Sequence, residues 1–134
     1  MKDFSSNEAP WDDSDIVEVV IGEGISYIGS NAFIEKDTIK NVSVPSTVSE
    51  IGTYAFSECS GIEEITIPYS VKKIGNGAFS KCDNLSEVYI EKGLEIVGFH
   101  AFNEDYVEKV TFTGSEAEWN TIVIKEFNDS LITE

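Results

Sequence analysis

The sequence predicts a β-rich repeat solenoid, in which short parallel strands of successive repeats stack into one sheet. Two observations support this prediction. A six-residue segment with the pattern Ile/Val-Gly-x-x-Ala-Phe occurs four times at a constant spacing of 23 residues, starting at Ile28, Ile51, Ile74 and Val97. Two apolar residues at period two accompany every copy. One unit of this length cannot bury its apolar face alone, so stacked units must share a continuous core.

The period-two residues predict one strand per repeat. They are Val19/Ile21, Val42/Val44, Ile65/Ile67, Val88/Ile90 and Val110/Phe112, with the last pair one residue early. Most of these residues are β-branched, which favours extended backbone. Because side chains alternate along a strand, both members of a pair point inward and the residue between them points outward. Pro45 and Pro68 follow two of the pairs, where proline can end a strand without breaking a ladder.

The six-residue segments predict the bend and part of the interior of each repeat. The glycine permits a tight bend or a close backbone approach, and the alanine and phenylalanine fill the core. We therefore expect the four phenylalanines to stack in one buried column, formed by Phe33, Phe56, Phe79 and Phe102. Other apolar positions recur in phase, namely Ile16, Ile39, Ile62, Leu85 and Val107, and Ile25, Val48, Val71 and Leu94.

Length indicates the number of domains, and composition excludes some classes of partner. The 134 residues suffice for one domain with a substantial core. There are 25 acidic and 9 basic residues, all of the basic ones Lys, and the formal net charge is −16. So few Lys cannot form a basic face for nucleic acid, and this charge also disfavours an anionic membrane surface. No apolar run approaches the roughly 18 residues of a membrane helix. Residues 1–10 contain no apolar segment typical of a signal peptide.

The repeat resembles the BspA-like leucine-rich repeat, whose pattern is A-F-x-x-C followed by L-x-x-V-x-I-P-x-S-V-x-x-I-G. Residues 55–75 match this pattern throughout, with Ile in place of Leu. The next unit departs from it at residues 91–93, and the first and last units lack the Cys. The resemblance extends from about Pro10 to Asn128. It implies a leucine-rich repeat fold, adhesion or protein binding, and a longer bacterial surface or secreted protein from which this chain is a segment.

Three regions are predicted. Residues 1–15 form an N-terminal flank, residues 16–112 a solenoid of about four and a half repeats, and residues 113–134 a C-terminal cap. Within the cap, Ser115 and Glu118 form an S-x-x-E capping box ahead of a short helix. Trp119 and Ile122 are three residues apart and are expected on one face of that helix. We expect this face to cover the last strand edge, which would otherwise invite pairing.

The residues with reactive side chains favour structural roles. Cys59 and Cys82 are one repeat apart, a separation that allows a disulfide but is more typical of two small buried thiols. His100 is expected at the surface, because the residue type at this turn position varies among the repeats. No nucleophile signature accompanies it, which argues against a catalytic role. The acidic segment 12–15 is interpreted as a solvated turn, with a calcium site as the alternative. No catalytic, cofactor-binding or metal-ligating residue is predicted.

The outward strand positions form the candidate binding face. Its residues are Ser43, Thr66, Tyr89 and Thr111, with Glu64 and Glu87 beside them. Tyr89 is the one large side chain among these six, and Tyr is a common anchor at protein interfaces. The face is either a solvated sheet surface or a recognition surface for a protein, such as a basic protein or a host matrix protein.

These inferences favour a non-catalytic protein-interaction or adhesion module of a bacterial surface or secreted leucine-rich repeat protein. Two alternatives come from different classes. One is a structural spacer or self-assembly segment of a larger surface protein. The other is a carbohydrate-acting enzyme built on the same scaffold. Neither a cofactor nor an oligomeric state is predicted.

Overall fold

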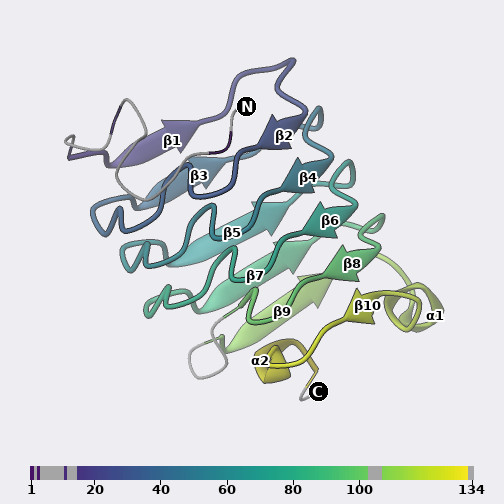
Figure 1. Ribbon diagram of the computed structural model, residues 1–134. Helices are drawn as coiled ribbons and strands as arrows, with labels where there is room; N and C mark the ends of the chain where they lie inside the picture. Colours follow the sequence, from purple (N-terminus) through teal and green to yellow (C-terminus); the bar gives the residue numbers. More distant parts are fainter. Residues whose placement is uncertain (2, 4–10, 12–14, 103–106, 133–134) are drawn as a thin grey trace.

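A computed structural model describes residues 1, 3, 11, 15–102 and 107–132 and shows a solenoid with two short strands in each turn (Figure 1). The first strands of the turns are β1 (Glu18–Val20), β3 (Asn41–Ser43), β5 (Glu64–Ile67), β7 (Glu87–Ile90) and β9 (Lys109–Phe112). The second strands are β2 (Tyr27–Ile28), β4 (Glu50–Ile51), β6 (Lys73–Ile74), β8 (Ile96–Val97) and β10 (Val123–Ile124). Two one-turn helices, α1 (Glu116–Trp119) and α2 (Asp129–Ile132), lie at the C-terminal end. The predicted β-rich solenoid with little helix is confirmed.

The strands form two walls, and all strand pairs are parallel. One wall contains the strand order β2-β4-β6-β8-β10, and the other contains β1-β3 followed by β5-β7-β9. The strand predicted for each repeat is present in the β1-to-β9 wall. The other wall was not predicted, because its strands are two residues long and too short to show a period-two pattern.

The β1-to-β9 wall is interrupted between β3 and β5. At the other steps, a backbone N–H ahead of the strand donates to the preceding turn. These bonds are Lys40 N to Val17 O at 2.8 Å, Ser86 N to Glu63 O at 2.9 Å and Glu108 N to Ser86 O at 2.8 Å. In the part of the chain that the structure describes, no equivalent bond joins Glu63 to Lys40. The expected single sheet is therefore wrong at this step, although β3 and β5 remain neighbours (Figure 1).

A column of aromatic rings runs through the interior, as predicted. Successive ring centroids lie 5.2 Å apart for Phe33 and Phe56, 5.5 Å for Phe56 and Phe79, and 5.2 Å for Phe79 and Phe102. The rings are nearly parallel, and Phe56 and Phe79 are completely buried. Trp11 extends the column, stacking on Phe33 at 5.2 Å. The N-terminal flank thus continues the packing of the repeats.

Two cysteines form a second buried column. Cys59 and Cys82 are free thiols with no exposed surface, which confirms the expected reduced, buried pair. Each thiol donates a hydrogen bond of 3.1 Å to a carbonyl oxygen of the preceding turn, from Cys59 to Phe33 and from Cys82 to Phe56. Burial raises the pKa of the Cys59 thiol to about 12 and also moves the pKa of Cys82 well above its ordinary value. Both thiols therefore stay protonated and unreactive at neutral pH.

The turn position that contains His100 has a special backbone conformation. Its φ values are 58° at Asn31, 55° at Tyr54, 63° at Gly77 and 53° at His100. Four residues later the same left-handed conformation recurs at Glu35, Glu58 and Lys81. This conformation is disfavoured for β-branched residues and accessible to Asn and Gly. The different residue types at this position therefore share one requirement, a left-handed backbone. The sequence does not display this requirement because the residue types differ.

The C-terminal segment packs differently from the prediction. The capping box is confirmed, because the Ser115 hydroxyl accepts from the Glu118 N–H at 3.2 Å and the Glu118 carboxylate accepts from the Ser115 N–H at 2.7 Å. However, α1 ends at Trp119, so Ile122 lies beyond the helix and the predicted common helical face is wrong. Ile122 is buried nonetheless, and Leu131 of α2 is buried as well. The segment also supplies β10, which pairs with β8. The predicted boundaries at residues 15 and 112 stay predictions.

The aromatic column predicts a large loss of stability on truncation of a central ring. Phe79→Ala should lower the free energy of unfolding by about 3–5 kcal/mol, because the cavity would be bounded by two rings of the same rigid column. Urea denaturation measures this loss. Phe99→Ala, at a side chain that is 42% exposed, is the matched control and should change stability by less than about 0.5 kcal/mol. A loss below about 1 kcal/mol for Phe79→Ala would contradict the packing described.

The buried thiols predict labelling that depends on unfolding. Cys59 and Cys82 should both resist a thiol reagent in the native protein and both react in denaturant, because the reagent attacks the accessible thiolate. Titration with a chromogenic disulfide under native and denaturing conditions counts them. Rapid labelling of both in the native state would contradict their burial, and no thiol after denaturation without reductant would reveal a disulfide.

Candidate functional site

The outward side chains of β5, β7 and β9 form two parallel rows, which together we call the strand face. Strand register places Thr66 opposite Tyr89 and Tyr89 opposite Thr111, and likewise Glu64 opposite Glu87 and Glu87 opposite Lys109. All six side chains are at least partly exposed. Tyr89 is 43% exposed and lies in the middle of its row.

Ser43, the remaining predicted site residue, lies outside this ladder. Its strand β3 pairs with β1, where Ser43 is opposite Val20. The interrupted step between β3 and β5 separates Ser43 from the row that contains Tyr89. The structure therefore brings five of the six predicted residues together and leaves the sixth on the neighbouring two-stranded sheet.

The strand face places two acidic residues opposite each other. Glu64 and Glu87 are direct partners across β5 and β7. Like charges directly opposite on neighbouring strands destabilise a sheet. Among the described residues, neither carboxylate forms an ion pair, although Lys109 follows in the same row. Two exposed acidic residues are therefore opposite each other without a direct ion pair in the described part of the chain, while Lys109 and Lys40 line depressions beside them.

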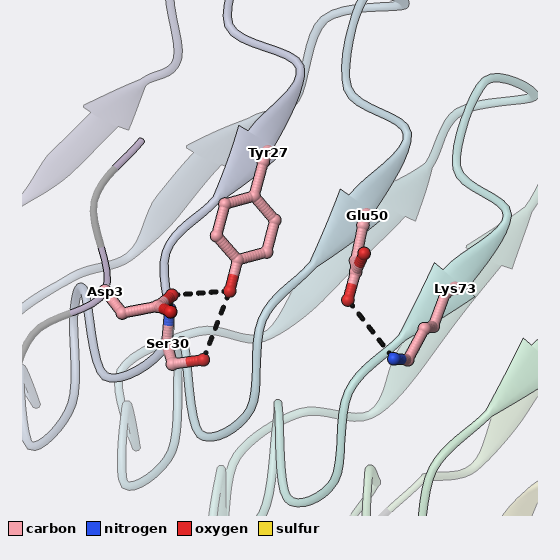
Figure 2. A network of polar contacts seen from close by, with 5 residues as sticks. All are labelled: Asp3, Tyr27, Ser30, Glu50 and Lys73. Carbon is pink, nitrogen blue, oxygen red and sulfur yellow. Dashed lines mark hydrogen bonds and ion pairs between the residues drawn. The ribbon is translucent and has the colours of Figure 1, made fainter.

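The other wall pairs its charges internally. Figure 2 shows Glu50 of β4 beside Lys73 of β6, with 3.3 Å between Oε1 and Nζ. On the same wall, the Asp3 carboxylate accepts hydrogen bonds from the Tyr27 hydroxyl and from the Ser30 N–H (Figure 2). The bond from Tyr27, together with that from Ser30, lowers the pKa of Asp3. Partial burial and the bond to Asp3 raise the pKa of Tyr27. On this wall Glu50 and Asp3 thus have partners, whereas Glu64 and Glu87 of the strand face form no ion pair among the described residues.

Two open depressions flank the Glu64–Glu87 pair. One, of about 300 Å³, lies along the strand face and is lined by Tyr89 and Lys109 among others. The second, of about 410 Å³, lies at the interrupted step and is lined by Lys40, Asn41, Gly61, Glu63, Glu64, Ser86 and Glu87. Glu63 adds a third carboxylate that was not predicted, because it precedes the period-two pattern. The Glu63-Glu64 doublet was the available signal in the sequence.

The other candidate groups give no catalytic arrangement. His100 is exposed, as predicted, and its ring stacks on Phe127 with centroids 4.3 Å apart. Within the described ranges, no three His, Cys, Asp or Glu side chains are grouped so that they could hold a metal ion. Residues 12–14 of the candidate calcium segment lie outside the described residues. No helix in the described part of the chain has the length and apolarity to cross a membrane.

Comparisons with known proteins agree with this architecture. Residues 7–130 match the family model of the BspA type leucine rich repeat region, in six copies. No curated protein matches the sequence. A leucine-rich cell surface protein from Faecalibacterium prausnitzii A2-165 has the same fold, with a TM-score of 0.72, 20% identity, and coverage of 81% of this chain and 35% of that one. A leucine-rich repeat protein from Bacteroides ovatus ATCC 8483 gives a TM-score of 0.44 and 22% identity, and the match covers 82% of this chain and 40% of that one. The chain spans less than half the length of either structure.

Proposed function

Because the chain belongs to the BspA-type leucine-rich repeat family, we propose that it is a non-catalytic protein-binding module of a bacterial surface or secreted protein. The Faecalibacterium protein with the same fold is described as a leucine-rich cell surface protein, which supports this setting. The chain covers 35% of that protein, so the proposal concerns one part of a larger parent. We place the binding surface on the strand face and expect a basic partner.

The single observation behind this assignment is the unpaired Glu64–Glu87 couple. Opposed like charges weaken the sheet that holds them. Solubility does not require this arrangement, because the chain already has a net charge of −16. A cationic group of a partner would relieve the repulsion and would be attracted by both carboxylates at once. The stability lost in the free protein would then be recovered on binding.

The fold supports recognition by a preformed surface. The residues that alternate with the strand face, Ile65 and Val88 among them, are buried in the core, so the outward side chains start from fixed backbone positions. A surface of this kind loses little conformational entropy on binding. The acidic field of the whole chain also accelerates encounter with a basic protein, more strongly at low salt.

Tyr89 is the expected anchor of the contact. It is flanked by Thr66 and Thr111, so its ring rises between two small neighbours. Central aromatic side chains commonly contribute most of the binding energy at an interface. The depression of about 300 Å³ beside it can receive a partner side chain that also reaches Glu64 and Glu87. The anchor and the charges thus act on one partner residue or on two adjacent ones.

Substitutions on the strand face should weaken binding without unfolding the protein. Tyr89→Ala should reduce the binding free energy by about 1–3 kcal/mol. In the same assay, Glu64→Lys with Glu87→Lys should mainly slow association, and the effect should shrink with added salt. Surface plasmon resonance with a lysine-rich peptide and a panel of host extracellular-matrix proteins measures both effects.

Matched controls test whether the effects depend on the strand face or only on the residue type that is changed. Tyr69→Ala removes a tyrosine that is 58% exposed and outside the strand face. Glu23→Lys with Glu95→Lys changes the net charge by the same amount at other exposed sites. Neither control should reproduce the strand-face effects. Binding that Tyr89→Ala and the strand-face charge reversal both leave intact would remove the strand face as the recognition surface. No binding of any basic probe would leave the spacer role as the better explanation.

The unpaired couple also predicts a gain of stability from a binding-defective variant. Glu64→Gln should raise the free energy of unfolding by a few tenths to about 1 kcal/mol at low salt, because it removes the repulsion from Glu87. Denaturant titration measures this gain. Glu50→Gln is the matched control and should not stabilise, since Glu50 pairs with Lys73. A loss of stability for Glu64→Gln would show that the couple is not in conflict.

A further inference from the structure

A second candidate site lies in the turns that follow the β2-to-β10 wall, and we call it the turn groove. It has a volume of about 410 Å³ and is lined by Tyr54, Ser57, Glu58, Lys81, His100 and Phe127, among others. It shares no lining residue with the two depressions beside Glu64 and Glu87. We propose that the turn groove binds a neutral oligosaccharide through one sugar ring. This activity is additional to the protein binding proposed for the strand face.

One side of the turn groove is the ring of Tyr54. This residue belongs to the turn between β4 and β5, and its side chain is 45% exposed. A Cβ atom at Gly77, the equivalent position one turn later, would lie 2.3 Å from Tyr54 Cε1. The ring therefore rests against the backbone of Gly77 and can do so because position 77 has no side chain. The Tyr54 ring is thus held against the Gly77 backbone in the unbound protein.

The lining also includes the stacked pair of His100 and Phe127. Their rings are 1° from parallel, with centroids 4.3 Å apart, and Phe127 is 48% exposed. The segment that bears Phe127 is attached to the turn of His100, because the His100 N–H donates to Glu126 O at 3.3 Å. The three aromatic residues that line the turn groove, Tyr54, His100 and Phe127, therefore all have contacts within the protein that restrain them.

The polar groups of the turn groove compensate each other. The hydroxyls of Ser57 and Ser80 lie 2.9 Å apart, within hydrogen-bonding distance. The Glu58 carboxylate pairs with the Lys81 ammonium at 3.2 Å, and both side chains remain accessible to solvent. The lining thus offers a hydrogen-bond acceptor and a donor with no excess charge. This balance is notable in a chain with a net charge of −16.

These features match the chemistry of a neutral sugar ring. A pyranose has an apolar C–H surface that packs on an aromatic face, and a rim of hydroxyls that both donate and accept hydrogen bonds. Because Glu58 and Lys81 already pair with each other, neither a cation nor an anion finds a free counter-charge in this pair, and the acidic field of the chain further disfavours an anion. A purely apolar ligand would desolvate both charged groups without replacing their hydrogen bonds. The volume is in the range of about 300–1,000 Å³ that is usual for small-molecule sites.

Titration of isotope-labelled protein with four neutral tetrasaccharides tests the proposal. The probes are maltotetraose, cellotetraose, tetra-N-acetylchitotetraose and β-1,4-galactotetraose, and tetralysine serves as the cationic comparison. At least one sugar should shift the amide resonances of Tyr54, Ser57, Ser80 and His100 in a saturable manner. Tetralysine should leave these four resonances unchanged.

Two substitutions test the aromatic wall while keeping the turn conformation. Asn31 occupies the equivalent position with φ 58°, so Asn is compatible with the left-handed backbone at positions 54 and 77. Tyr54→Asn removes the ring, and Gly77→Asn displaces it by filling the space beneath it. Each should weaken sugar binding about tenfold, the loss expected for one aromatic contact. Tyr69→Asn is the matched control and should bind like the parent protein. Circular dichroism melts establish that each variant is folded.

Three results would overturn the proposal. The first is that none of the four sugars shifts the turn-groove resonances. The second is that tetralysine shifts them at lower concentration than any sugar does. The third is that folded Tyr54→Asn and Gly77→Asn proteins bind sugar like the parent. None of these results bears on the strand face, because binding there is read out through Tyr89, Glu64 and Glu87.

Discussion

Contact between stacked phenylalanine rings is the interaction on which the rest of this structure depends. The rings are 5.2–5.5 Å apart, slightly more than the strand spacing of about 4.8 Å. Each ring therefore stacks on the ring of the next turn at close to the spacing of the strands. Because Phe33, Phe56, Phe79 and Phe102 occupy the same position in their turns, this contact fixes the relative register of all four turns. Both strand walls inherit that register.

The same register determines which side chains meet on the surface. Equivalent residues of successive repeats become neighbours. A residue type that recurs at one repeat position therefore forms a row of identical side chains. On one wall the register places Glu50 beside Lys73, which is a favourable pair. On the strand face it places Glu64 beside Glu87, which is not. The repetitive architecture therefore gives a like-charged couple wherever two successive repeats keep the same acidic residue. Such a couple is available to a cationic group of a partner when neither carboxylate already forms an ion pair, as for Glu64 and Glu87 among the described residues.

Much of the structure follows from the sequence, and the exceptions have physical causes. The strand register, the aromatic column, the buried Cys59 and Cys82, and the capping box all depend on residues with a fixed spacing, which a sequence displays directly. The second wall depends on two-residue strands, which are too short to show a period. The break between β3 and β5 lies between repeats that look alike in sequence, so no spacing or residue type indicates it. The His100–Phe127 stack joins residues 27 apart, outside the 23-residue phase, so only the folded chain brings them together.

The left-handed turn position has a consequence for how such a protein diversifies. Asn31, Tyr54, Gly77 and His100 differ in size, charge and aromaticity, yet all adopt φ between 53° and 63°. What the four residues share is the sign of one torsion angle rather than a side-chain chemistry, and this angle is easiest for Gly and Asn and hardest for β-branched residues. This position therefore holds four unrelated residue types within one chain while the aromatic column stays intact. Because Tyr54 and His100 occupy this position and both line the turn groove, the turn conformation determines where variation in side-chain type reaches that groove.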